Sequence, residues 1–332
     1  MTKLPFISVI IKTYNEEAGI EKTISSIKKN MGTFPHKIIV ADSLSTDKTQ
    51  EIATKMNTTV VSLTDANDRC CGVGHQLGYL YSEGDFLLLL DGDMELESGF
   101  IERGVSFLLE NTQYAGVAGS VEMDDVDSYE FKSRKQRLHQ IYPIGDCSHL
   151  GGGGLYRKSA IDEIGYLTNR NLHAYEESEL GMRLTHAGYK LHRLNVPYFF
   201  HTSYTMSSLA LMKHRWKGGY LFAPGELVKG AFGTPLFSHA LKTIKNEAIF
   251  AVYLLILFVS LLSLNPMLIG ATSLPLFAFI GLKTIKNRSI RDALQSVLNL
   301  SVFAAGLIRG LFIPLKDPKT PPPHTVINEG KK

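Results

Sequence analysis

The sequence predicts an α/β protein whose mostly parallel sheet is covered by helices on both faces, followed by helices that enter a membrane. Three observations predict this. Short apolar runs alternate with helix-like stretches before residue 236, four leucines lead directly into two carboxylates at residues 87–93, and residues 248–282 carry no charge. Regular alternation of strand and helix favours a parallel sheet.

Four segments have the composition of strands that are buried on both faces. They are FISVIIKTY (6–14), HKIIVADS (36–43), TTVVSLT (58–64) and GDFLLLLDGD (84–93). Such β-branched and apolar runs are typical of parallel strands. The intervening stretches, EEAGIEKTISSIKKN, TDKTQEIATKM and GVGHQLGYLYSE, are predicted to be helices.

Acidic residues follow two of these strands, at the edge where parallel sheets bind ligands. Asp42 follows the second strand, although an isolated acid there can also serve as a helix cap. Asp91 and Asp93 follow the fourth strand, and adjacent carboxylates repel each other unless a cation compensates them. Hard divalent cations often combine one or two carboxylates with substrate phosphates, so we expect a metal-diphosphate site here.

Other features exclude several classes of protein. The sequence has neither a GxxxxGK[ST] motif nor GxGxxG after the first strand, which argues against an ATPase and an NAD enzyme. A net charge of +3 without a basic cluster argues against nucleic acid as a partner. Cys70, Cys71 and Cys147 lack zinc-site spacing and are expected to be reduced. The apolar run before Lys12 is too short for a signal peptide, so the chain is expected to start in the cytoplasm.

The uncharged segment 248–282 predicts a helical hairpin. Asn265-Pro266 divides it into two halves, each near the lower limit of roughly 17 residues for a membrane helix. Because the flanking basic residues lie outside the segment, both ends are expected on the cytoplasmic side; these residues are Lys242, Lys245, Lys283, Lys286, Arg288 and Arg291. The alternative is a buried hairpin of a soluble protein.

A third apolar segment, 293–315, carries Gln295, Asn299 and Arg309, so it either spans poorly or lies in the membrane interface. The Pro-rich, polar residues 316–332 are predicted to be a disordered tail. The predicted organisation is therefore a domain over 1–235, a membrane region over 236–315 and this tail.

Five motifs, in this order, resemble the family 2 glycosyltransferases with a GT-A fold, which is Rossmann-like. They are SVIIKTYNEE, VADSLSTDKT, GDFLLLLDGD, GGGGLYRKSAI and EESELGMRLTHAGYKL, and the resemblance covers about residues 5–220. It implies a nucleotide-sugar half over about 1–95 and an acceptor half over about 96–235.

The resemblance also implies roles for individual residues. Contacts to the nucleoside, diphosphate and sugar of a nucleotide-sugar would come from Thr13, Tyr14, Glu16, Asp42, Arg69 and Asp91. Asp93 would bind Mn²⁺ or Mg²⁺. Glu177 stands where the family carries the catalytic Asp of an ED pair, and Glu176 precedes it.

The assignment of the catalytic base has alternatives. Glu177 is one methylene longer than Asp, so Glu176 or Glu179 could serve instead, and Glu177 could be only an acid at a helix terminus. If this stretch is helical, Glu179 and Arg183 are spaced i, i+4 and are expected to form a surface ion pair.

Three further features have two interpretations each. The four glycines after Leu150, among them Gly152 and Gly153, are expected to line the sugar or acceptor, and the alternative is a flexible loop. His201 is a candidate metal or phosphate ligand, or a structural histidine. MKHRWKGGY resembles the QxxRW element of processive synthases without its Gln, so Arg215 would contact the diphosphate and Trp216 the acceptor, or both lie at the bilayer surface.

These inferences predict an inverting, metal-dependent glycosyltransferase of the hexosyltransferase type in a cell membrane, multi-pass, with a cytoplasmic catalytic domain. It would transfer one sugar, from a UDP-sugar since UDP is the commonest donor nucleotide in the family, to a lipid-linked or glycan acceptor in polysaccharide or glycolipid synthesis. Membrane lipids are the other expected partners. The alternatives are a processive polysaccharide synthase, an inactive nucleotide-sugar or lipid-binding subunit, and a sugar nucleotidyltransferase, which would need a Gly-rich basic loop in place of KTYNEE.

Overall fold

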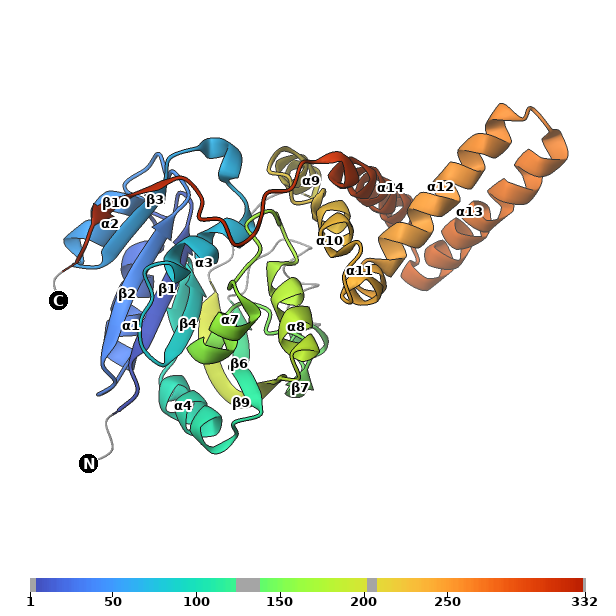
Figure 1. Cartoon of the computed structure of the whole chain (residues 1–332). Coiled ribbons are helices and arrows are strands. Elements are labelled where there is room, and N and C mark those ends of the chain that lie inside the picture. Colours follow the sequence, from blue (N-terminus) through green and yellow to red (C-terminus); the bar gives the residue numbers. More distant parts are fainter. Residues whose placement is uncertain (1–3, 124–137, 202–207, 331–332) are drawn as a thin grey trace. The chain divides into compact units, whose positions relative to one another are not determined.

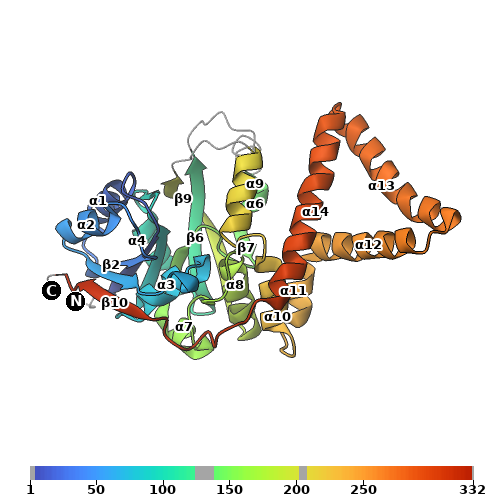
Figure 2. The ribbon, with the colours of Figure 1, turned by 90° about the horizontal axis from the view of Figure 1, so that it is seen from above.

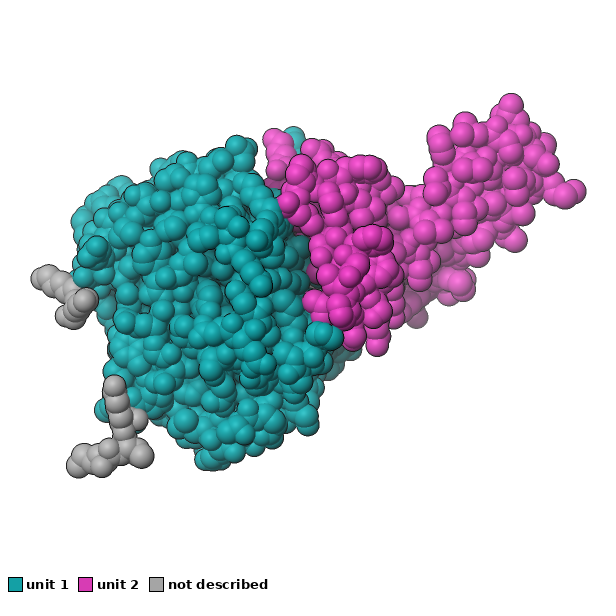
Figure 3. All heavy atoms as spheres, viewed as in Figure 1, with its two compact units in different colours: residues 1–214, 316–332 teal, residues 215–315 magenta. Residues whose placement is uncertain are grey.

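The computed structural model describes residues 4–123, 138–201 and 208–330 of the chain. The chain divides into two compact units, one formed by residues 1–214 and 316–332 and the other by residues 215–315 (Figure 3). The boundary thus falls before the predicted residue 235, and the first unit includes the carboxyl-terminal segment.

The first unit is built on four parallel strands: β1 (Ile7–Thr13), β2 (His36–Asp42), β3 (Thr59–Leu63) and β4 (Phe86–Asp91). They lie in the order β3-β2-β1-β4 (Figure 1). Their apolar side chains are almost entirely buried, which explains the continuous apolar runs. The four predicted strands are confirmed, and so are the helices between them, α1 (Ile20–Asn30), α2 (Thr49–Lys55) and α3 (Cys71–Tyr79).

Glycines let α3 approach β1 closely. A Cβ atom on Gly78 would lie 2.2 Å from Ile10 Cγ2, and one on Gly74 would lie 2.6 Å from Lys12 Cβ. The Lys12 side chain therefore fits between the helix and the end of its strand. The short helix η1 (Ala66–Asp68) precedes α3.

The second half of the sheet is mixed. β8 (Gly154–Arg157) is antiparallel to β4 and β6 (Tyr114–Met123), and β9 (Lys190–His201) is parallel to β6. β5 (Met94–Leu96) and β7 (Gly145–Cys147) pair antiparallel with β9. Because Met94 pairs with His201, Asp93 is brought beside His201. The helices of this half are α4 (Phe100–Glu110), α6 (Leu138–Ile141), α7 (Lys158–Ile164) and α8 (Glu176–His186).

The carboxyl-terminal segment is ordered, so the prediction of a disordered tail was wrong. Residues His324–Asn328 form β10, which pairs antiparallel with β3 at the edge of the sheet (Figure 1). The segment has too few apolar residues to form a core of its own, but the unpaired backbone groups of an edge strand offer it hydrogen bonds. Composition alone does not reveal such a partner.

The second unit is helical. It contains the end of α9 (Ser208–Lys217), whose earlier residues belong to the first unit, with α10 (Ala223–Ala231) and α11 (Phe237–Thr243). Three helices that are long and apolar enough to cross a membrane follow: α12 (Lys245–Leu262), α13 (Pro266–Asn287) and α14 (Ile290–Phe312). Leu264 is 82% exposed and Phe277 is 66% exposed. Apolar side chains exposed on this scale favour contact with lipid over a buried hairpin.

The predicted turn at Asn265 is confirmed. Asn265 caps α13, since its Oδ1 accepts hydrogen bonds from the N–H groups of Met267 and Leu268, and Pro266 occupies the first helical position. α12 and α13 meet at this turn (Figure 2).

Candidate active site

The Lys12 side chain contacts carboxylates from two different elements, at the carboxyl ends of the parallel strands. Its Nζ lies 3.3 Å from Asp91 Oδ1, after β4, and 3.0 Å from Glu176 Oε1, in the first turn of α8. Burial opposes the charge of Lys12, but the carboxylates of Asp91 and Glu176 outweigh it and hold the lysine pKa well above its ordinary value. The side chain is therefore a fixed cation. The sequence prediction missed Lys12, although a lysine within an apolar strand could have indicated it.

His75 of α3 lies on the other side of Asp91. Its Nε2 is 3.2 Å from the carbonyl oxygen of Leu90 and 3.8 Å from Asp91 Oδ1. Burial, and then the charge of Lys12, lower the pKa of His75 to about 4. The ring is therefore neutral near pH 7, and its Nε2–H donates to Leu90. The position of a neutral His75 beside Asp91 was also not predicted.

Asp93 and His201 are in contact, as the predicted metal site requires. Asp93 Oδ2 lies 3.2 Å from His201 Nε2. Asp93 Oδ1 is buried and has no hydrogen bond within the described part of the chain. A buried carboxylate oxygen without a partner is unfavourable, so this oxygen is available to a cation.

Glu16 adds a third carboxylate to this edge. It lies against Gly92, since a Cβ atom on that glycine would be 2.8 Å from Glu16 Cγ. Burial, followed by the negative charges of Asp93 and Asp91, raises the pKa of Glu16 to about 8. Glu16 is thus a half-buried acid that lies beside two other carboxylates.

The crowded acids fit a divalent cation with substrate ligands. No group of three or more His, Cys, Asp or Glu side chains in residues 4–123, 138–201 and 208–330 is arranged to hold a metal by itself. A cation would thus take Asp93 and His201 from the protein and complete its shell with phosphate oxygens and water, as Mg²⁺ commonly does.

Glu177 is held by the glycine loop. Its Oε1 accepts hydrogen bonds from the N–H groups of Gly152, at 2.8 Å, and Gly153, at 2.9 Å. Its Oε2 has no hydrogen bond from any residue that the structure describes. Burial, and then the charge of Glu176, raise the pKa of Glu177 to about 7. The carboxylate is therefore oriented through one oxygen, while the other can accept a proton near neutral pH.

The backbone around Glu177 needs unusual conformations. Gly152 and Gly153 have φ values of +79° and +86°, and a Cβ atom on Gly153 would lie 2.1 Å from the carbonyl oxygen of Leu89. Tyr175, just before the acidic pair, has φ +66°, a conformation that is costly for residues other than glycine. These constraints aim both N–H groups of the loop at Glu177, whereas the sequence prediction placed these glycines against the substrate.

A buried arginine supports the same loop. Arg193 of β9 is 1% exposed and donates from Nη2 to the carbonyl oxygen of Gly151, at 3.1 Å, and from Nη1 to that of Gly119, at 2.5 Å. Its guanidinium lies 5.0 Å from the centre of the Tyr142 ring. Nothing in the local sequence around Arg193 predicted this role.

Tyr14 and Arg69 form an exposed platform after β1. The Arg69 guanidinium lies 4.0 Å from the centre of the Tyr14 ring, and its Nη1 donates to Tyr14 Oη at 3.0 Å. Arg69 Nε also donates to the carbonyl oxygen of Ser43, at 2.8 Å. Tyr14 is 42% exposed, so the pair presents an aromatic face and a positive charge to a ligand.

Comparison with known proteins assigns a family to the part of the chain that carries Lys12, Asp91, Asp93 and the glycine loop. Residues 8–165 match the family model described as "Glycosyl transferase family 2". The chain contains a family 2 glycosyltransferase domain.

Two curated relatives have the same kind of name. The chain is 34% identical over 203 residues to "Glycosyltransferase AglE" of Haloferax volcanii, which covers 57% of this chain and 64% of AglE. It is 31% identical over 115 residues to "4,4'-diaponeurosporenoate glycosyltransferase" of Staphylococcus haemolyticus, which covers 33% of this chain and 30% of that protein. The chain therefore spans less than two thirds of either relative.

Solved structures share the fold. The mannosyltransferase PcManGT of Pyrobaculum calidifontis, in complex with GDP-Man and Mn²⁺, has a TM-score of 0.60 at 15% identity, covering 94% of this chain and 88% of that one. S. aureus TarS 1-349 in complex with UDP-GlcNAc has a TM-score of 0.50 at 17% identity and covers 93% of both chains. The predicted GT-A fold is confirmed.

Asp42 lies inside the family 2 domain and not on its surface. Its carboxylate accepts hydrogen bonds from Thr13, Ser45, Gln50 and Ser62, and the residue is 0% exposed. We therefore expect Asp42 to support the nucleoside site indirectly, by holding the loop that follows β2 in place.

Glu179 forms the predicted i, i+4 ion pair with Arg183, whose Nη2 is 2.8 Å from Glu179 Oε2. The prediction that the pair lies on the surface was wrong, because both residues are buried in the first unit. Arg183 also donates to the carbonyl oxygens of Tyr166 and Leu167, and these bonds hold it inside. Glu179 is thus engaged in packing, which leaves Glu177 as the better candidate for the base.

Arg215 and Trp216 belong to the helical unit. Trp216 packs edge-on against Phe222, with ring centres 5.1 Å apart, and the Arg309 guanidinium lies 4.5 Å from the Phe222 ring and 5.8 Å from the Trp216 ring. These contacts fit the alternative in which Trp216 lies at a bilayer surface, beside a helix that is apolar enough to cross a membrane.

Proposed function

We propose that the protein is a membrane-anchored, metal-dependent, inverting glycosyltransferase that moves one sugar from a nucleotide-sugar to an acceptor hydroxyl. The observation that carries the proposal is the arrangement of Glu177, which is oriented by two backbone N–H groups through Oε1 and keeps Oε2 for a proton. The family 2 domain and the named glycosyltransferase relatives support the same activity.

The chemistry requires a base and a way to stabilise the leaving group. The acceptor oxygen attacks C1 of the donor sugar, its proton passes to Glu177 Oε2, and the bond from C1 to the diphosphate oxygen breaks with its electron pair on the departing nucleoside diphosphate. General-base assistance contributes about 10²- to 10⁴-fold in rate. A Mn²⁺ or Mg²⁺ ion held by Asp93 and His201 would supply charge stabilisation for the diphosphate.

The platform of Tyr14 and Arg69 suits a nucleotide. An aromatic face can pack on a base, and a guanidinium binds phosphate oxygens well. PcManGT was solved with GDP-Man and TarS with UDP-GlcNAc, which supports a nucleotide-sugar as the class of donor. UDP remains the nucleotide that we expect.

The membrane helices suggest where the acceptor lies. With the hairpin of α12 and α13 in the bilayer and its basic flanks in the cytoplasm, the family 2 domain would work at the cytoplasmic face of the membrane. A lipid-linked acceptor suits an enzyme anchored there, in the synthesis of a surface polysaccharide or glycolipid.

A processive synthase is the second candidate, favoured only by the partial QxxRW element. Met212 replaces its Gln, and we expect transfer to stop after one sugar. An inactive binding subunit is disfavoured because Asp91, Asp93 and Glu177 all keep their carboxylates.

The test is to incubate the detergent-purified chain with a panel of nucleotide-sugars, with Mn²⁺ and with EDTA, and to measure released nucleoside diphosphate. We expect one donor to be hydrolysed above the others, only with the metal present. If no donor is turned over and calorimetry detects no binding of UDP, GDP or other nucleoside diphosphates, the proposed function fails.

A further inference from the structure

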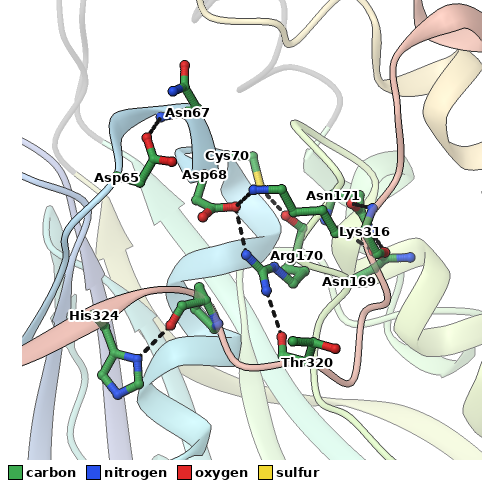
Figure 4. A network of polar contacts seen from close by, with 11 residues as sticks. Asp65, Asn67, Asp68, Cys70, Asn169, Arg170, Asn171, Lys316, Thr320 and His324 are labelled. Carbon is green, nitrogen blue, oxygen red and sulfur yellow. Dashed lines mark hydrogen bonds and ion pairs between the residues drawn. The ribbon is translucent and has the colours of Figure 1, made fainter.

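The chain returns to the first unit after the last apolar helix. Residues 316–330, which we call the strap, run along this unit and end in β10 beside β3 (Figures 1 and 4). Besides pairing with β3, the strap contacts the loop between β3 and α3 at two residues, Thr64 and Asp68.

The strap extends the sheet beside that loop. His324 pairs with Leu63, the last residue of β3, and the N–H of Thr64 donates to the carbonyl oxygen of Pro323 at 3.0 Å. Tyr81 Oη lies 2.8 Å from His324 Nε2. The start of the loop is therefore fixed by backbone pairing with the strap.

Asp68 is the second attachment point. It is 5% exposed, and its Oδ1 lies 2.6 Å from Lys316 Nζ of the strap and 2.7 Å from Arg170 Nη2 (Figure 4). Arg170 Nη1 in turn donates to the carbonyl oxygen of Thr320, at 2.7 Å, and the N–H of Lys316 donates to Asn171 Oδ1, also at 2.7 Å. The buried Oδ1 atom of Asp68 thus contacts two cationic side chains, and one of them comes from the strap.

Arg69 directly follows Asp68 in the chain but points to the candidate active site. Its guanidinium is fixed by the carbonyl oxygen of Ser43 and by Tyr14, the platform described above. The backbone between the two side chains is fixed by the short helix η1, which ends at Asp68, since the N–H of Arg69 donates to the carbonyl oxygen of Ala66. A displacement of Asp68 would therefore displace Arg69.

We propose that the strap positions Arg69 for nucleotide binding by holding the Asp68 carboxylate, so that Lys316, Arg170 and Asp68 are positioning residues. This inference rests on the proposed function, because it assumes that Arg69 binds the nucleotide. It makes the segment after the membrane helices a structural part of the nucleotide site.

The experiment compares three variants of the full-length protein with the unchanged chain. Asp68→Asn keeps the size of the side chain but removes its charge, and Lys316→Met removes only the contact from the strap. Lys319→Met is the matched control, because the Lys319 side chain lies over Gly165 and has no described contact with Asp68. The measurements are the dissociation constant of the nucleoside diphosphate that the unchanged protein binds, with Mn²⁺, and kcat and KM for the donor.

We expect both Asp68→Asn and Lys316→Met to raise the dissociation constant and the donor KM by about 3- to 30-fold, with kcat nearly unchanged, since a bond to a charged group is lost but only part of its effect reaches Arg69. Lys319→Met should match the unchanged protein. A merely structural strap would lower Tm and leave KM unaltered, and that result would overturn the inference. If Asp68→Asn does not fold, Lys316→Met carries the test alone, because it keeps the pair between Asp68 and Arg170.

Hydrogen exchange separates this inference from the proposed function. If the unchanged protein binds no nucleoside diphosphate, the proposed function is at fault, and the strap is judged by the exchange of residues 65–70 without ligand. Both variants should increase exchange in this loop relative to Lys319→Met. Unchanged exchange would show that the strap does not hold the loop.

Discussion

Substitution of Glu177 by Gln tests the centre of the proposed mechanism. Glutamine keeps the size of the side chain, and its carbonyl oxygen can still accept from the N–H groups of Gly152 and Gly153, at 2.8 and 2.9 Å in the unchanged protein. The substitution removes the ability to take a proton and the negative charge of the ionised carboxylate, but keeps the hydrogen bonds that orient the side chain. The donor and the metal should therefore bind as before while transfer falls.

The magnitude follows from the role and the pKa of Glu177. Loss of a general base costs about 10²- to 10⁴-fold in rate. Because burial and Glu176 raise the pKa of Glu177 to about 7, and a base must be deprotonated, the unchanged enzyme should lose activity as the pH falls through 7. With one group titrating, its rate at pH 6 should be about one tenth of the maximum, and the Gln variant should lack this step.

The same pKa predicts the effect on stability. A carboxyl whose pKa is raised from 4.5 to about 7 by folding binds more protons in the folded state, so its contribution to stability is full below pH 4.5 and is lost as the pH rises through 7. Glu177→Gln should therefore fold at least as stably as the unchanged chain at pH 8. A lower Tm at that pH would mean that the ionised carboxylate is needed for folding.

The assay measures release of nucleoside diphosphate at saturating donor and acceptor between pH 5.5 and 8.5, with calorimetric titration of nucleoside diphosphate and Mn²⁺ in parallel. Transfer by Glu177→Gln within about threefold of the unchanged rate would refute the role of Glu177 and move the base to Glu176 or elsewhere. Loss of nucleotide binding in the variant would instead make Glu177 structural.

Three other predictions concern the metal, the buried lysine and the membrane. Asp93→Asn should weaken nucleotide binding in Mn²⁺ and have little effect on binding in EDTA, and equal weakening in both titrations would contradict a metal role. Lys12→Met should lower the free energy of unfolding by about 3–5 kcal/mol, since it leaves two carboxylates without their cation, and denaturant titration at pH 8 showing no loss would contradict this. Reporters fused after Lys242 and after Arg291 should both report the cytoplasm, with Asn265 accessible from the other side; an outside signal at Arg291 would exclude the hairpin.

Local patterns predicted much of the first half of the sheet and its ligand edge. A parallel strand buried on both faces has a continuous apolar run, and the side chains at its carboxyl end follow directly in the sequence, as Asp91 and Asp93 do. The turn at Asn265 was likewise local, because Asn and Pro cap and begin a helix by themselves.

The features that were missed depend on residues far apart in the sequence. Arg193 supports the glycine loop by bonds that reach Gly119, 74 residues away, and β10 has a partner more than 250 residues before it. Lys12 pairs with Glu176 across 164 residues. A pattern of composition cannot show such partners, and the burial of Arg183 was misjudged for the same reason.

The pairing of β10 with β3 also limits how the chain can pass through a bilayer. The chain leaves the first unit after His214 and is back in it at Lys316, and two hydrogen-bonded strands cannot lie on opposite sides of a membrane. The intervening residues, all of which the structure describes, must therefore cross an even number of times. Three helices are long and apolar enough to cross, so they cannot all do so.

In the hairpin that we propose, α12 and α13 cross the membrane and return, which leaves α14 as the helix that stays on the starting side. Its sequence suits that place, since it carries Asp292, Gln295 and Asn299. Gly306 and Gly310 let it pack closely on the segment that leads into α10, because a Cβ atom on either would lie within 2.1 Å of a carbonyl oxygen there. Three apolar helices are thus compatible with a chain that leaves the first unit and returns to it on the same side of the membrane, because only two of them cross.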